Sequence, residues 1–228
     1  TIYDTTLNPE TWPLALEQTA AFVGGRAATL AAHDTARGEG NLMYVWGDDP
    51  DYRMHYIKEL AATNPVVVTT HLACEPGQVF SLSQIFPYDE YCQSRLFLEW
   101  AKPQGWGDMT HGLLEKSGSR FGHFGVAHDV GKSPVGEEPR RRLRLLLPHV
   151  IRAVAISKAM ELKQTAAESL SSTIDSLSAA VFLVGKDCSI VHCNRSAQAM
   201  LDAGNVVQKA DGILAFTRAA AKDELRRA

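Results

Sequence analysis

Residues 109–128, MTHGLLEKSGSRFGHFGVAH, decide the fold of this chain. Met109, His111 and Leu113 alternate with Thr110, Gly112 and Leu114, as side chains do on the two faces of a strand. Ser117-Gly118-Ser119 has turn composition, and alternation resumes from Phe121 to His128 with Phe124 and Val126 on one side. The stretch therefore predicts a β-hairpin that contributes two long strands to an antiparallel sheet.

Upstream of the hairpin, the pattern predicts helices and a second pair of strands. Asn8-Pro9 is a helix start whose apolar residues continue to Gly24-Gly25, and Asp48-Asp49-Pro50 is another start whose helix ends before Asn64-Pro65. Between these helices, residues 26–33 and 41–46 are typical of strands. We expect residues 66–87 to be irregular and residues 88–100 to form a helix, because aromatic residues recur there on one helical face.

Downstream of the hairpin, a long helix is predicted over residues 140–176. Beyond it, residues 180–184 and 189–193 are typical of strands, Asn194 is a natural cap for a helix over 196–201, and a strand follows at 213–216. The prediction is an α+β chain in three parts: an antiparallel sheet domain (1–155), a connecting helix (156–176) and a small α+β module (177–228).

Composition excludes several classes of protein. The net charge is -3, which gives no overall attraction to nucleic acid. No stretch is long and apolar enough for a transmembrane helix, and the start of the sequence has no signal-peptide pattern, so we expect no membrane partner. The four cysteines occur singly, which favours reduced thiols in the cytoplasm over disulfides or structural zinc.

No catalytic signature is present in the sequence. It contains no G-x-S-x-G, P-loop, G-x-G-x-x-G or H-E-x-x-H pattern, so we expect a protein that is not an enzyme and name no catalytic residue. An enzyme with an unrecognised site is kept as an alternative hypothesis, which a cluster of acids, bases and a nucleophile in one cavity would favour.

The eight histidines raise the question of a metal or a haem. His123 and His128 are five residues apart on one predicted strand and point to opposite faces, so they cannot grip one ion. His111 and His123 lie on neighbouring strands and are able to face the same side, and His71 could join them. We favour structural histidines with no metal ligands and no cofactor, and keep haem or metal binding as an alternative.

Aromatic residues are concentrated in the middle of the predicted first domain. Aromatic walls with a few polar tips suit a small-molecule pocket, but they also suit an ordinary core, and the residues alone do not separate the two. As candidate ligand-binding residues the sequence offers Tyr44, Trp46, Tyr56, Tyr91, Trp100, Trp106 and His123.

Two stretches resemble known families. Residues 91–154 are similar to the sensory half of LuxR-type helix-turn-helix regulators, with W-A-K-P-Q-G-W at 100–106, F-G-V-A-H at 124–128, Glu137-Glu138 and L-L-P-H-V-I-R-A-V at 146–154. Residues 177–201, LSAAVFLVGKDCSIVHCNRSAQAML, resemble the opening of a PAS domain, in which a strand pair ends in an Asn that caps a helix.

The resemblance implies a GAF-like sensory domain, a connecting helix and an incomplete PAS-like module. The family's DNA-binding helix-turn-helix is not in the sequence, so DNA is implied as a partner only through that missing C-terminal domain. The implied function is to sense an aromatic or apolar small molecule and to pass the signal on by a shift between dimer arrangements.

A rival hypothesis from another class is a dimerisation or interaction module that binds no ligand. A homodimer is expected in either case, because Leu162, Ala166, Leu170 and Ile174 continue an apolar stripe beyond the first domain.

Overall fold

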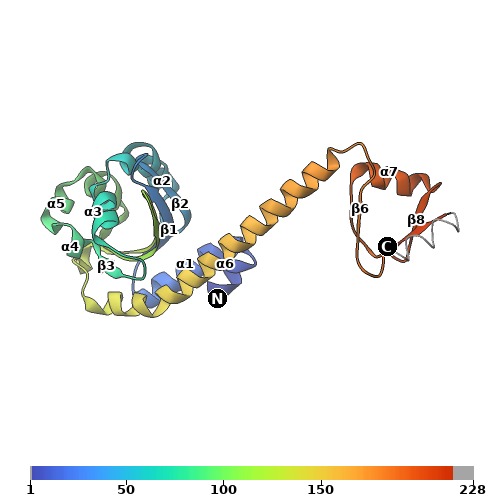
Figure 1. Cartoon of the computed structure of the whole chain (residues 1–228). Coiled ribbons are helices and arrows are strands. Elements are labelled where there is room, and N and C mark those ends of the chain that lie inside the picture. The colour runs from blue at the N-terminus through green and yellow to red at the C-terminus, as the bar shows by residue number, and fades with distance from the viewer. Residues whose placement is uncertain (1, 218–228) are drawn as a thin grey trace. The chain divides into compact units, whose positions relative to one another are not determined.

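The computed structural model describes residues 2–217, which form two units: residues up to Lys158 and residues from Ala159 onward. The first unit contains five strands and six helices in sequence order, together with short 3-10 and π turns (Figure 1). Its α-helices and strands are α1 (Trp12–Val23), β1 (Ala27–Asp34), β2 (Glu39–Trp46), α2 (Pro50–His55), α3 (Pro65–Ala73), β3 (Val79–Ser81), α4 (Leu82–Ile85), α5 (Tyr88–Gln93), β4 (Trp106–Ser117), β5 (Arg120–Asp129) and the beginning of α6 (Glu137–Asp175).

The five strands form one antiparallel sheet in the order β2-β1-β5-β4-β3. The predicted hairpin is confirmed: β4 and β5 pair from Trp106 and Asp129 down to Ser117 and Arg120. Gly118 has a φ of +57°, which a residue without a side chain adopts at no steric cost, so the turn closes where the sequence predicts it. The strand pair 26–33 and 41–46 is confirmed as β1 and β2, and the α+β fold class with it.

Helices α1 and α6 cover one face of the sheet. Phe124 and Val126 of β5, Leu30 of β1 and Leu114 of β4 pack there against both helices. A Cβ added to Gly112 of β4 would lie 2.4 Å from a methyl carbon of Leu147, so the missing side chain lets α6 approach the sheet closely. From the helices, this cluster buries Trp12, Ala15, Leu16, Ala20, Val23, Leu143, Leu147, Val150 and Ala153.

Short helical segments cover the other face, and here the sequence prediction was partly wrong. Residues 66–87 are not irregular, because they contain α3, β3 and α4. The run Val66-Val67-Val68-Thr69-Thr70 has low helix propensity, but Asn64 caps α3 by accepting a hydrogen bond from the Val66 amide (3.0 Å), and Pro65 occupies the first turn.

The helix predicted over 88–100 is interrupted. α5 ends at Gln93, Ser94 is extended, and its hydroxyl accepts a hydrogen bond from the Phe97 amide (3.2 Å), so a new helical segment begins and leads into a π turn at Phe97–Ala101. Further short turns lie at Ile2–Thr6, Pro9–Thr11, Tyr56–Leu60, Ala61–Thr63, Lys102–Gln104 and Val130–Lys132.

The second unit begins within α6, which ends at Asp175, close to the expected residue 176. It contains β6 (Phe182–Val184), β7 (Ile190–Cys193), α7 (Arg195–Ala203), β8 (Val207–Ala210) and β9 (Ile213–Phe216). β6 pairs with β7 and β8 with β9, both antiparallel. The predicted strands and helix of this part are confirmed as far as Phe216, and β8 was missed; the remainder of the module expected to reach residue 228 lies outside the described residues.

Asn194 is the buried anchor of the second unit. Its Oδ1 accepts hydrogen bonds from the amides of Ala197 and Val181, both at 2.9 Å, so the predicted N-cap is confirmed. Its Nδ2 donates to the carbonyl oxygens of Ala179 (2.8 Å) and Ile174 (3.1 Å). One amide side chain therefore joins the end of α6, the start of β6 and the start of α7.

Within residues 2–217, the helices lack the combination of length and hydrophobicity that crossing a lipid bilayer requires.

We predict that Asn194→Ala destabilises the second unit by about 2 kcal/mol, because it removes the acceptor of one buried amide (Ala197) and one half-buried amide (Val181). Hydrogen exchange measured by mass spectrometry checks this: peptides covering 178–203 should exchange faster while those covering 106–129 keep their rate. Asn205→Ala is the matched control, since Asn205 is exposed. Unchanged exchange in the Asn194 variant would show that the network does not hold the unit together.

Candidate functional site

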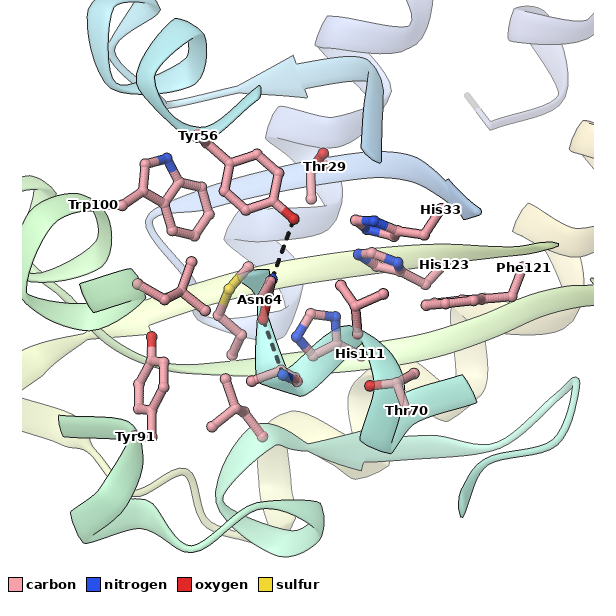
Figure 2. Close-up of a pocket in the computed structure, with 15 residues that line it drawn as sticks. Thr29, His33, Tyr56, Asn64, Thr70, Tyr91, Trp100, His111, Phe121 and His123 are labelled. Atoms are coloured by element: carbon pink, nitrogen blue, oxygen red, sulfur yellow. Dashed lines mark hydrogen bonds between the residues drawn. The ribbon is translucent and has the colours of Figure 1, made fainter. Parts of the chain in front are cut away.

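A cavity of about 50 Å³ lies between the sheet and the short helical segments on the face opposite α1 and α6. Figure 2 shows the residues that line it: histidines from the strands, and Tyr56, Asn64 and Thr70 from the segments that cover this face. The lining residues are Thr29, His33, Tyr56, Asn64, Val66, Val67, Thr70, Leu82, Tyr91, Leu96, Trp100, Met109, His111, Phe121 and His123.

Three histidines from adjacent strands form a row in this wall. His33 of β1 and His123 of β5 are stacked, with ring centroids 5.1 Å apart and an interplanar angle of 3°. His111 of β4 meets His123 edge-on at 5.0 Å. A Cβ on Gly125 would lie 3.3 Å from Nδ1 of His111, so the missing side chain leaves room for that ring. We call these three residues the histidine row.

Each ring of the histidine row is buried and has a nitrogen with no hydrogen-bond partner among the described residues. These atoms are Nδ1 of His33, Nε2 of His111 and Nδ1 of His123, and the indole Nε1 of Trp100 in the same cavity wall is also unpartnered. Most buried polar groups in proteins are hydrogen-bonded, since an unpartnered one carries the full penalty of its desolvation. Four such atoms among the residues of one cavity therefore point to polar contacts that the chain itself does not supply.

Burial also sets the protonation state of the row. Desolvation lowers the pKa of His33 and of His111 to about 4, and it lowers the pKa of His123 well below the ordinary value. For His111 the negative charge of Asp108 raises the pKa, whereas His33 and His128 lower it further. All three rings are neutral at pH 7, so each offers one N–H donor and one acceptor nitrogen.

Aromatic side chains form the wall opposite the row. Tyr56 and Trp100 pack with centroids 4.9 Å apart, and Trp106 meets Trp100 edge-on at 5.0 Å. The Tyr56 hydroxyl accepts a hydrogen bond from Asn64 Nδ2 at 3.2 Å, drawn as a dashed line in Figure 2, and burial raises the pKa of Tyr56 to about 12. Burial likewise raises the pKa of Tyr91, so neither tyrosine carries charge near neutral pH.

The sequence-predicted site residues fall into three groups. Tyr56, Tyr91, Trp100 and His123 line the cavity. Trp46 and Trp106 border a second, smaller cavity of about 20 Å³, which Trp100 also lines. Tyr44 lies elsewhere: it stacks on Trp12 at 5.7 Å and packs with the α1 side of the core.

Tyr44 was misplaced because neighbouring residues of a strand face opposite ways. Tyr44 pairs with Leu30, which packs under α1, so its side chain points away from the cavity. The number of aromatic residues in a stretch does not show which face of the sheet each of them occupies. We therefore exclude Tyr44 from the candidate site.

Several residues of the site were not singled out from the sequence. His33 was missed although alternation along β1 places it on the same face as Thr29. Asn64 and Thr70 were missed because α3 was not expected. The signal was present: Asn64-Pro65 repeats the cap-plus-proline pattern of Asn8-Pro9 and Asp49-Pro50, all three of which cap helical segments.

The expectation that His111 and His123 face the same side is confirmed by their ring contact. His128 faces the other side, where its Nε2 lies 2.8 Å from the Thr110 hydroxyl. Across residues 2–217, no three His, Cys, Asp or Glu side chains are arranged to hold a metal ion. A porphyrin needs far more space than 50 Å³, so the described geometry gives the haem alternative no support.

Comparison with known proteins finds solved structures of similar fold but no related sequence. No protein-family model and no curated protein sequence matches this chain. The solved structures similar to it include the VqsR LBD domain from Pseudomonas aeruginosa, with a TM-score of 0.57 and 15% sequence identity over 69% of this chain and 92% of that chain.

A domain of a putative two-component sensor histidine kinase from Sinorhizobium meliloti has a TM-score of 0.50 and 14% identity over 69% of this chain and 96% of that one. A weaker likeness, with a TM-score of 0.46 and 14% identity over 71% and 92%, is to the GAF domain of a phosphoenolpyruvate-protein phosphotransferase from Coxiella burnetii. At these identities the first two likenesses show a shared fold.

We predict that the histidine row makes the first unit less stable as the pH falls from 7 to 5. The unfolded chain binds more protons in this window, because the pKa values of His33 and His111 are about 4 when folded and 6.5 when unperturbed. The free energy of unfolding should fall by about 2 kcal/mol for each of them by pH 5. Urea titration with tryptophan fluorescence reports this unit, since all four tryptophans lie in it.

Replacing His111 by Phe should flatten that pH dependence. His149→Phe is the control, because His149 is exposed and should leave the slope unchanged. An unaltered slope in the His111 variant would mean that the buried ring does not titrate as the geometry requires.

Proposed function

We propose that the first unit is a GAF-like sensory domain of a bacterial transcription regulator and that it binds a small molecule in the cavity beside the histidine row. The observation that carries the proposal is the set of unpartnered nitrogens of His33, His111, His123 and Trp100 around that cavity. A ligand with hydrogen-bonding groups would relieve the desolvation of these atoms, and the aromatic wall would cover its apolar part.

The likeness to sensory domains supports the same proposal. One structural neighbour is a ligand-binding domain by name, and another is a domain of a putative sensor histidine kinase. Because one fold serves many functions, the likeness adds to the argument from the site and does not replace it. The LuxR-type assignment, the PAS-like second module, DNA as the eventual target and a cytoplasmic location are parts of the proposal that rest on the sequence resemblance and on the four unpaired cysteines.

The size of the cavity limits what binds without rearrangement. A volume of 50 Å³ has room for roughly three to five waters, whereas pockets for drug-sized ligands measure about 300–1,000 Å³. A ligand of more than a few heavy atoms therefore requires the covering segments to move outward. Binding would favour the expanded form, and this change in conformation would transmit the presence of the ligand to the rest of the chain.

The small volume also favours the second candidate function, an interaction module that binds no ligand. In that case the aromatic residues form a core, and the unpartnered nitrogens lower the stability of the fold locally and serve no function. The two candidates differ in whether any small molecule occupies the cavity.

We propose further that the chain forms a homodimer through the part of α6 that lies in the second unit. Leu162 is 72% exposed and Leu170 is 61% exposed, and Ala166 between them is also exposed. Each Leu that a partner helix buries would contribute roughly 1.5–3 kcal/mol, and a two-fold dimer satisfies the same stripe on both copies.

The ligand hypothesis predicts that protein purified from its native host retains a small molecule. Native mass spectrometry should show an added mass that disappears on denaturation. The variant Thr70→Phe, which places a ring in the cavity, should lose that mass, while Val68→Phe on the exposed side of α3 should keep it. A protein that carries no added mass, and that no fraction of host metabolites stabilises against heat, would favour the interaction module.

The dimer hypothesis predicts that Leu162→Glu with Leu170→Glu converts a dimer to a monomer, because two buried charges replace two apolar contacts. Analytical ultracentrifugation at micromolar concentration measures the change. Gln164→Glu with Ser172→Glu is the matched control on the opposite side of the helix and should remain dimeric. A wild-type protein that sediments as a clean monomer would exclude this dimer.

A further inference from the structure

We propose that the ligand of this cavity is an uncharged molecule with a hydroxyl-like group, able both to donate and to accept hydrogen bonds, on a small apolar frame. The inference rests on the proposed sensing function and narrows it from any small molecule to one chemical class. It excludes carboxylates, phosphates and ammonium compounds.

The first argument is the absence of charge from the wall. None of the described residues that line the cavity is Asp, Glu, Lys or Arg. An ion that enters an apolar site without a partner of opposite charge loses its hydration and gains little in return. A charged ligand would therefore have to find its counter-charge within the histidine row.

The histidine row does not supply that charge. Its three rings are neutral near pH 7 because they are desolvated, and the charges of His33 and His111 would lower the pKa of His123 further. To protonate one ring for an anionic ligand would require working against both effects. For a cationic ligand the row offers only neutral acceptor nitrogens.

The nearest buried carboxylate, Asp108, is already occupied. Its Oδ1 accepts hydrogen bonds from the amides of Met109 (2.7 Å) and Ser83 (3.3 Å). Its Oδ2 accepts from the Ser83 hydroxyl (2.6 Å) and the Val135 amide (2.9 Å). With four donors on its two oxygens, and outside the cavity lining, Asp108 does not serve as the counter-ion of a cationic ligand.

The second argument is the kind of polar atom that the wall presents. The Trp100 indole N–H only donates, so the ligand needs an acceptor. A neutral imidazole presents one donor and one acceptor, so the unpartnered nitrogens of His111 and His123 accept from a ligand O–H or donate to its oxygen. A hydroxyl group pairs with the Trp100 N–H and with either tautomer of these rings, whereas a carboxylate pairs only with nitrogens that donate, and an ammonium cannot pair with the Trp100 N–H at all.

The test uses matched probes that differ only in the head group. On a butyl frame they are 1-butanol, butyrate and butylammonium; on a phenyl frame they are benzyl alcohol, benzoate, benzylammonium and toluene. Binding to the full chain is measured by NMR, from the indole N–H signal of Trp100 and the imidazole nitrogens of uniformly ¹⁵N-labelled protein. We expect the two alcohols to shift these signals and to bind at least tenfold more tightly than the charged members of their frames.

Variants of the wall separate recognition from simple insertion into an apolar space. Trp100→Phe and His123→Phe each remove an unpartnered nitrogen and keep an aromatic ring. Each should weaken the binding of benzyl alcohol about fivefold and reduce the difference in affinity between benzyl alcohol and toluene. His149→Phe is exposed and should change neither affinity. Far-UV circular dichroism and the remaining tryptophan signals of each variant establish that it stays folded.

Each outcome decides the inference. A charged probe that binds as tightly as its alcohol, or toluene binding as tightly as benzyl alcohol, overturns the assigned class and leaves the sensing function standing. If none of the probes shifts the Trp100 and histidine signals, the assigned class is wrong. The sensing function then stands or falls separately on whether the purified protein retains an added mass.

Discussion

The rest of the structure depends on a five-stranded antiparallel sheet that is covered on both faces. Antiparallel sheets often leave one face in water, where polar residues of alternating strands are solvated. Here α1 and α6 cover one face and α2 to α5 the other, so buried polar residues of β4 and β5 such as Asp108, His111 and His123 have no solvent to face (Figure 1). Each of them has to be satisfied within the protein or remain unpartnered.

The protein satisfies most of these groups and leaves the rest at one place. Asp108 receives four hydrogen bonds, and His128 pairs with Thr110 at 2.8 Å. The unpartnered nitrogens of β1, β4 and β5 are those of His33, His111 and His123, which lie together beside the cavity. Of the seven buried side-chain atoms that have no partner within residues 2–217, four belong to residues of this one cavity, which is the pattern expected where stability has been traded for a binding site.

The two faces of the sheet also differ in how they are packed. On the α6 side, Gly112 lets Leu147 approach so closely that a larger residue would displace its side chain, and Leu143 and Val150 are fully enclosed. On the cavity side, the cover consists of short segments with breaks at Asn64 and Ser94. Asp108 joins the two, because it binds Ser83 of α4 and Val135 just before α6. A displacement of the cavity wall would therefore act on the same buried carboxylate that holds the start of α6.

The sequence alone determined the elements whose signals are local. The β4–β5 hairpin, the caps at Asn8, Asp49 and Asn194, and the long helix follow from alternation, from capping chemistry and from apolar periodicity, which act over a few residues. Only the tertiary structure decided α3, because a run of β-branched residues becomes helical through its cap and through burial of Val66 and Thr70. It also decided the site, since the faces on which Tyr44 and His33 lie, and the meeting of three histidines from three strands, depend on strand pairing between residues far apart in the chain. No local pattern records that pairing, and it is the pairing that places polar rings where water cannot reach them.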